Sequence, residues 1–179
     1  IMDWADAHVT STFFICWGAQ AAMYHFYGLK KRLLPQKLFG LYPHKVENRR
    51  EPLVRGFDDE FYAPHSRHTT VDAEEIRACK DLTILAESDE AGVFIAMAEE
   101  GRKIFVFGHP EYDRVTLEKE YLRDKNKGLD IQIPKNYFPD DNSDNRPLLM
   151  WRAHANTLYT NWINYYVYQN TPYVWEDEE

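Results

Sequence analysis

The hydrophobic and polar positions of the chain first form a short apolar run and then, without a break, a helical pattern. Residues 12–15 are β-branched and aromatic, and small helix-favouring residues follow from Gly18 to Met23. The run predicts a strand, and the small residues predict a helix that ends near Tyr27, because Gly28 supplies a C-terminal stop. A strand therefore passes directly into a helix near the start of the chain.

Further elements follow from the same two patterns. Alternating and apolar runs predict strands over residues 33–46, 82–86, 93–98 and 104–107, with a hairpin turn at 99–102. Helical spacing predicts helices over residues 4–8, 73–79, 116–127 and 148–168, the second of them capped by Asp72. Residues 53–71 mix polar groups with aromatics, which favours a loop that lines a site.

Cys16 stands at the junction between the first strand and its helix. A residue on such a tight bend projects from the sheet edge beside the free N–H groups of the helix, which favour the nucleophilic thiolate. The N–H of Trp17 would point to the place where an oxyanion forms. Free cysteine is more often a small buried hydrophobe, as we expect for Cys79. Position alone leaves both a structural and a nucleophilic role open for Cys16.

His109 follows the apolar run 104–107 just as Cys16 follows the run 12–15. In a parallel sheet both side chains would lie at the carboxyl edge, where open α/β folds bind their ligands. Glu111 lies two residues after His109, and alternate side chains of an extended segment face the same way. The three residues predict a nucleophile, a base and a carboxylate that fixes the tautomer of the base.

Composition and charge narrow the class of protein. The 179 residues are 44% hydrophobic and 15% aromatic, which predicts one domain, 1–179, with a substantial core and an acidic tail over residues 174–179. A net charge of −8 argues against non-specific binding to nucleic acid. Two cysteines favour a reducing compartment, and no apolar run reaches the ~20 residues of a membrane span, so we expect a cytoplasmic protein with no membrane partner.

Two other observations concern metals and the start of the chain. His65 and His68 have a spacing that could hold a metal, but no carboxylate or cysteine stands at a matching position, so no metal is predicted. The opening residues 1–4 do not resemble a natural start, and the first strand follows almost at once. We therefore expect this sequence to be the C-terminal part of a longer chain.

Five motifs carry a resemblance to a known family. They are Ile-Cys-Trp-Gly-Ala-Gln-Ala at 15–21, Arg-Gly-Phe-Asp-Asp at 55–59, Ala-Pro-His-Ser-Arg at 63–67, Gly-His-Pro-Glu-Tyr-Asp at 108–113 and Asn-Trp-Ile-Asn-Tyr-Tyr-Val-Tyr at 161–168. In this order they resemble the homoserine O-acyltransferases of methionine biosynthesis, over about residues 4–173. The resemblance implies a class I glutamine-amidotransferase-like fold, a flavodoxin-like open sheet flanked by helices, with the N-terminal part missing.

The resemblance also implies catalytic roles. Cys16 would be acylated by an acyl-coenzyme A, with Trp17 as an oxyanion donor, His109 as the general base and Glu111 as its partner. The acyl-coenzyme A is then a cosubstrate, and no bound cofactor is expected. A homodimer is also implied.

The same resemblance implies how homoserine is bound. Lys37 and Ser66 match substrate-binding positions, and Arg123 matches the arginine expected to hold the carboxylate of the amino acid. Glu120 lies one helical turn before Arg123 and is a candidate partner for the amine. Without the resemblance, Lys37, Glu120 and Arg123 would pass for ordinary surface charges.

The alternatives differ in donor and in acceptor. The Cys-Trp-Gly-Ala-Gln form of the elbow favours an acetyl donor, but the position that selects acetyl over succinyl lies in the missing part. A cysteine hydrolase or amidotransferase of the same fold would use the same three residues with water or ammonia as acceptor. A non-catalytic binding fragment is the third alternative.

Overall fold

The structure is a computed structural model that describes residues 1–172, so the predicted acidic tail over residues 174–179 lies outside the described residues. Six strands form one sheet in the order β1-β6-β5-β4-β2-β3. Their bounds are β1 Thr12–Ile15, β2 Lys31–Val46, β3 Glu60–Val71, β4 Leu82–Ser88, β5 Gly92–Ala98 and β6 Lys103–Val106. Every strand predicted from the sequence is present.

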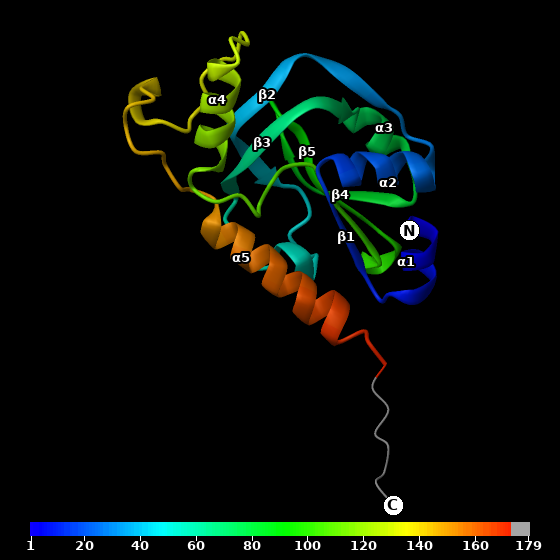
Figure 1. Ribbon diagram of the computed structural model, residues 1–179. Helices are drawn as coiled ribbons and strands as arrows, with labels where there is room; N and C mark the ends of the chain where they lie inside the picture. Colours follow the sequence, from blue (N-terminus) through cyan, green and yellow to red (C-terminus); the bar gives the residue numbers. More distant parts are fainter. Residues whose placement is uncertain (173–179) are drawn as a thin grey trace, which may run out of the picture.

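Helices cover both faces of this sheet (Figure 1). They are α1 Met2–His8, α2 Trp17–Tyr27, α3 Ala73–Ala78, α4 Thr116–Asn126 and α5 Arg152–Asn161, and α5 continues into the π-helical turn η4 Trp162–Tyr168. This arrangement confirms the α/β class and the open sheet flanked by helices. No helix among residues 1–172 is long and apolar enough to cross a membrane.

The alternation of side chains along β5 assigns the helices to their faces. Ala96 packs with α2 and α3 in one core cluster, whereas its neighbours Ile95 and Met97 pack with α5 and η4 in another. Successive residues of a strand point to opposite faces, so the two clusters lie on opposite sides of the sheet. A third cluster joins α4 to β2, with Leu117 and Leu41 among its buried residues.

The pairing of β1 with β6 determines at which edge of the sheet the candidate site lies. These two strands are parallel, with Ile15 opposite Val106, and all other neighbouring strands of the described sheet are antiparallel. The sheet is therefore mixed, and not wholly parallel. The parallel relation still holds for the one pair whose ends carry Cys16 and His109, so both residues leave the sheet at the same edge.

Two sequence predictions are corrected by the structure. The stretch predicted as a loop, 53–71, contains β3, which pairs with β2 from Lys31↔Val71 to Lys45↔Glu60. Its buried polar residues, His65, Arg67 and Thr70, hide the strand pattern, because polar residues of a strand are expected to face water. The helix predicted from residue 148 begins at Arg152, since the N–H of Leu148 bonds to the carbonyl of Tyr137 at 2.8 Å in an irregular segment.

We predict that Gly40→Ala destabilises the fold by roughly 2 kcal/mol or more. Gly40 has φ +135° and lies against residue 135, whose backbone N and O would each stand 2.4 Å from an added Cβ. The backbone of Lys135 is fixed there by bonds to Phe39 and Leu41 on either side of the glycine. Urea unfolding followed by circular dichroism measures the loss.

Gly92→Ala is the matched control for that experiment. Gly92 has φ +73°, but no atom lies within 4 Å of its added Cβ, so this variant carries backbone strain without a clash. Equal losses for the two variants would contradict the role given to the contact between Gly40 and Lys135.

Candidate active site

The bend predicted at Cys16 is present. Cys16 caps α2 with φ 48° and ψ −110°, a strained conformation for a residue with a side chain. Its N–H donates to the carbonyl of Val106 at 2.7 Å, and its carbonyl accepts from Gln20 at 3.1 Å. The side chain is only 9% exposed, so the sulfur is more enclosed than the sequence suggested.

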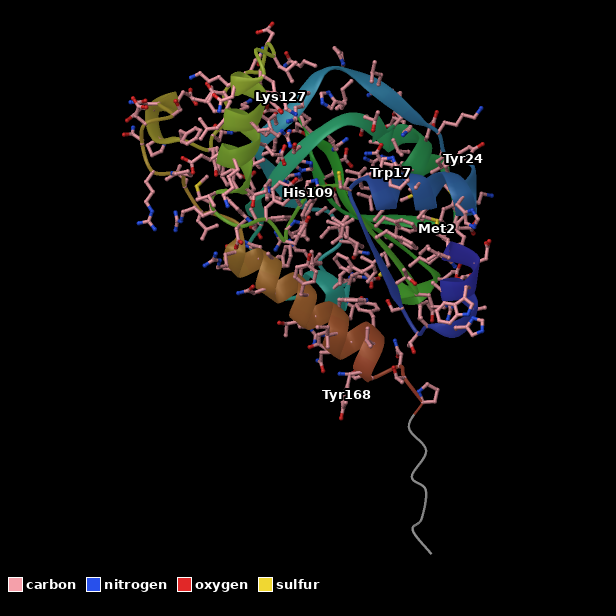
Figure 2. The ribbon with its side chains drawn as sticks, in the orientation of Figure 1. Met2, Trp17, Tyr24, His109, Lys127 and Tyr168 are labelled. Carbon is pink, nitrogen blue, oxygen red and sulfur yellow. The ribbon has the colours of Figure 1, made fainter. Side chains whose placement is uncertain are left out.

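Trp17 is the first residue of α2, so its N–H has no intrahelical acceptor. Its indole is 65% exposed, beside the enclosed sulfur of Cys16. Figure 2 shows Trp17 and His109 at the same edge of the sheet, where β1 and β6 end. An N–H in this position is available to a developing negative charge next to the sulfur.

His109 and Glu111 meet as predicted. The Nδ1 atom of the His109 ring lies 2.7 Å from Oε1 of Glu111. The imidazole therefore has Nε2 free of this carboxylate. The backbone N–H of His109 donates to the carbonyl of Pro64 at 2.8 Å. Cys16, His109 and Glu111, which the sequence predicts as nucleophile, base and orienting carboxylate, thus lie at one edge of the sheet.

The pKa of His109 reports this environment. Burial by itself would lower the pKa, but the interactions with Cys16 and Glu111 outweigh burial and raise it to about 9, from an ordinary value of 6.5. Since the pKa is higher in the folded chain, the charged imidazole stabilises the fold fully below pH 6.5. This contribution is lost as the pH rises through about 9.

We predict that Glu111→Gln lowers the pKa of His109, because the amide carries no charge to favour the imidazolium. The titration of the His109 ring protons, followed by NMR, should move to lower pH. Asp113→Asn is the control, since its exposed carboxylate lies in the same loop and reaches Arg152 only at 4.0 Å. A His109 titration that moves equally in both variants would contradict the specific pairing with Glu111.

Three predicted substrate-binding residues form a second cluster, from β2, β3 and α4. Ser66 Oγ donates to Oε2 of Glu120 at 2.6 Å, and Nζ of Lys37 lies 3.3 Å from the same oxygen. Lys37 also lies 3.6 Å from Oδ2 of Asp124. Residues far apart in the sequence are thus brought together as the resemblance implied.

Glu120 is ionised in this cluster. Burial would raise the pKa of its carboxyl, but hydrogen bonds from Ser66 and Tyr112 and the charge of Lys37 outweigh burial and lower it. A half-buried carboxylate with a lowered pKa carries its negative charge at neutral pH. It is therefore a suitable partner for a cationic group of a ligand.

Arg123 is placed differently from the other predicted residues. Its side chain is 53% exposed, and its Nε and Nη2 bond to the two carboxylate oxygens of Asp124 at 2.7 and 3.0 Å. Asp124 is itself buried and also faces Lys37. The guanidinium of Arg123 is thus held beside the cluster by a residue that sequence reasoning missed.

A cavity of about 470 Å³ opens beside this cluster. Lys37 and Asp124 belong to its lining, together with Phe39, His68 and the segment 129–132. The charged cluster lies at one wall of this space. A small polar molecule in the cavity would reach Lys37 and Asp124 directly.

The two histidines with metal-like spacing lie in different surroundings. His65 is buried and its Nε2 lies 3.0 Å from Nε2 of His44, whereas His68 is exposed at the cavity. Burial lowers the pKa of His44 to about 3 and that of His65 well below its usual value. No group of three or more metal-ligating side chains exists among residues 1–172.

Sequence reasoning also missed Tyr112, which connects His109 to the charged cluster of Lys37, Ser66 and Glu120. Its ring stacks on the His109 imidazole, with 4.2 Å between centroids and 15° between planes. Its hydroxyl donates to Oε1 of Glu120 at 2.9 Å. The motif Gly-His-Pro-Glu-Tyr-Asp was the one signal that could have pointed to it.

Solved structures of low sequence identity share this fold. A protein described as a GMP synthase component from Thermoplasma acidophilum matches 90% of this chain and 59% of its own, with a TM-score of 0.59 and 17% identity. A glutamine amidotransferase from Methylobacillus flagellatus matches 92% of this chain and 66% of its own, with a TM-score of 0.57 and 13% identity. The expectation of a class I glutamine-amidotransferase-like fold is confirmed.

Curated relatives are much closer in sequence. A homoserine O-acetyltransferase from Lachnoclostridium phytofermentans is 66% identical over 97% of this chain, and one from Agathobacter rectalis is 62% identical over the same share. The chain spans 58% and 56% of the length of these two relatives. The profile of the family described as homoserine O-succinyltransferase matches residues 1–173. This chain therefore belongs to the homoserine O-succinyltransferase family.

Proposed function

We propose that the protein transfers an acyl group from an acyl-coenzyme A to the hydroxyl of L-homoserine, as a step of methionine biosynthesis. The observation that carries the proposal is that one residue, Tyr112, joins the proposed base to the charged cluster: its ring stacks on His109 and its hydroxyl donates to Glu120. A cysteine with a base explains acyl capture, and the charged cluster explains an amino-acid acceptor. Acetyl is the favoured donor, because relatives of 55–66% identity are named O-acetyltransferases.

The first half of the reaction acylates Cys16. Its thiolate attacks the thioester carbonyl carbon, and the N–H of Trp17 stabilises the negative oxygen of the tetrahedral intermediate. The bond from that carbon to the coenzyme A sulfur then breaks. Coenzyme A leaves with the proton that the His109 imidazolium donates.

The second half transfers the acyl group to homoserine. His109, now neutral, takes the proton of the homoserine hydroxyl, and the hydroxyl oxygen attacks the acyl carbon on Cys16. The carbon–sulfur bond breaks, the ester forms, and the thiolate and imidazolium are restored. Glu111 holds the tautomer of His109 that makes this proton transfer possible.

The charged cluster supplies the binding groups for the acceptor. The carboxylate of Glu120 suits the ammonium group of homoserine, and the guanidinium of Arg123, oriented by Asp124, suits its carboxylate. Lys37 and Ser66 hold Glu120 in place and also reach the acceptor. An acceptor bound in this way presents its hydroxyl toward His109.

The experiment that tests the proposal is intact-protein mass spectrometry on the complete gene product. The protein is mixed with acetyl-coenzyme A or succinyl-coenzyme A, and L-homoserine is added afterwards. We expect an acetyl adduct that maps to Cys16 and that homoserine discharges. A succinyl adduct in its place would reassign the donor, and no adduct with either thioester would contradict the proposal.

A cysteine hydrolase or amidotransferase is the second candidate, because solved structures of the same fold include a glutamine amidotransferase. Such an enzyme would pass the acyl group to water or ammonia. Thioester consumption that requires homoserine supports the acyltransferase, and consumption without homoserine supports the hydrolase.

The proposal includes two properties of the enzyme as a whole: it is cytoplasmic and it forms a homodimer. Both rest on the family and on the metabolic step proposed here. Light scattering coupled to size-exclusion chromatography tests the dimer.

A further inference from the structure

One side chain, Tyr112, contacts both the proposed base, His109, and the charged cluster of Lys37, Ser66 and Glu120. Its ring lies face to face with the His109 imidazole at 4.2 Å, and its hydroxyl lies 2.9 Å from Oε1 of Glu120. The other oxygen of Glu120 receives Ser66 and Lys37. The rigid phenol therefore fixes how far the Glu120 carboxylate stands from the imidazole.

The backbone of Tyr112 is fixed as well. Its N–H donates to the carbonyl of His109 at 3.2 Å, and its carbonyl accepts the indole N–H of Trp151 at 3.0 Å. Trp151 is 2% exposed and belongs to the buried cluster under α4. The position of the phenol is thus set by the core, and not by the flexible side chains around it.

The hydroxyl of Tyr112 remains a donor over the whole physiological range. Burial and the nearby charge of Glu120 raise its pKa well above the ordinary value of 10.0. A protonated hydroxyl next to a carboxylate donates a charge-assisted hydrogen bond, which is stronger than a neutral one. This bond holds Glu120 in one orientation.

We propose that Tyr112 is a positioning residue that sets the spacing between the general base and the group that binds the acceptor's amine. The inference rests on the proposed function and adds a determinant of acceptor length. An amino acid held by its ammonium group at Glu120 reaches His109 only if its hydroxyl stands at the matching distance. The fixed spacing therefore selects a hydroxy-amino acid of one chain length, and L-serine, which is one methylene shorter, is the natural probe.

Tyr112→Phe separates the two contacts, because it keeps the ring on His109 and removes only the bond to Glu120. We expect KM for L-homoserine to rise about 10-fold, the loss typical of a hydrogen bond to a charged group. The preference for L-homoserine over L-serine should fall by a similar factor. The rate of Cys16 acylation by acetyl-coenzyme A, measured in the absence of acceptor, should not change.

Tyr112→Leu removes the ring too and should also slow the acylation of Cys16, since His109 loses its stacking partner. Tyr121→Phe is the matched control: Tyr121 lies next to Glu120 on α4, and its ring packs near Phe138, with 6.4 Å between centroids. We expect this variant to keep the wild-type KM values. Circular dichroism checks that all three variants fold.

The outcomes separate the inference from the proposed function. If the wild-type protein forms no adduct that homoserine discharges, the proposed function fails and the role of Tyr112 fails with it. If wild-type transfer occurs but Tyr112→Phe keeps the wild-type KM for homoserine, only the inference is overturned. An equal loss in acylation rate and in homoserine affinity would also overturn it, because a general structural defect would explain both.

Discussion

Cys16→Ala should abolish turnover and leave no acyl adduct on the protein. The proposed mechanism passes the acyl group through a bond to the Cys16 sulfur, and alanine offers no atom that can form this bond. Removal of the nucleophile from a coupled nucleophile–base pair typically lowers kcat by at least about 10⁴-fold. Steady-state thioester consumption and intact mass after mixing with acetyl-coenzyme A measure the two effects.

Cys79→Ala is the control for that experiment, because Cys79 is the other free thiol and packs against the core between the sheet and α3. We expect this variant to keep both the adduct and the turnover. A stoichiometric adduct in Cys16→Ala, together with undiminished turnover, would refute the proposed mechanism.

His109→Ala should lower kcat by about 10²–10⁴-fold, the usual range for a general base. Both halves of the reaction lose their proton carrier, so neither acylation nor discharge by homoserine proceeds at the wild-type rate. Rates measured from pH 6 to 9 at saturating substrates test this, because the variant should lack the wild-type dependence on the imidazole. Part of the stability should be lost with the charged imidazole, and circular dichroism checks that the variant still folds.

His25→Ala serves as the control for the loss of an imidazole. His25 lies on α2 and pairs with Asp3, with its side chain 39% exposed and outside the described site. Its removal should leave kcat within twofold of wild type. Wild-type activity in His109→Ala would assign the base to another group.

The placement of Cys16, His109 and Glu111 at one edge of the sheet was predictable because it depends on local sequence. The change from β-branched residues to small ones at Cys16 requires a tight bend, whatever the rest of the chain does. The apolar run before His109 and the two-residue spacing to Glu111 are also local signals. The parallel pairing of β1 and β6 then brings the local pieces together.

The charged cluster was not predictable from such local signals. Lys37, Ser66 and Glu120 come from β2, β3 and α4, and their contacts exist only after these elements pack. The residues were identified by resemblance to the family alone. Asp124 and Tyr112 were missed for the same reason, since nothing in a charged helix or a loop motif marks a side chain as buried against a partner.

The strand β3 was missed for a different reason. Strand prediction from sequence depends on polar side chains facing water, and β3 buries Arg67 and His65 inside the protein. Arg67 satisfies its guanidinium with the backbone carbonyls of Thr69 and Ala91. A strand with polar groups on its inner side has the composition of a loop.

The parallel pairing of β1 with β6 has a consequence for the order in which the protein folds. The whole β2–β5 region lies between these two strands in the sequence, and most of it is built from antiparallel neighbours. Contacts between residues so distant in the chain carry a high entropic cost and form slowly. The antiparallel pairs β2–β3 and β4–β5 can form before β1 joins the sheet, so Cys16 meets His109 only when the central part of the sheet is already assembled.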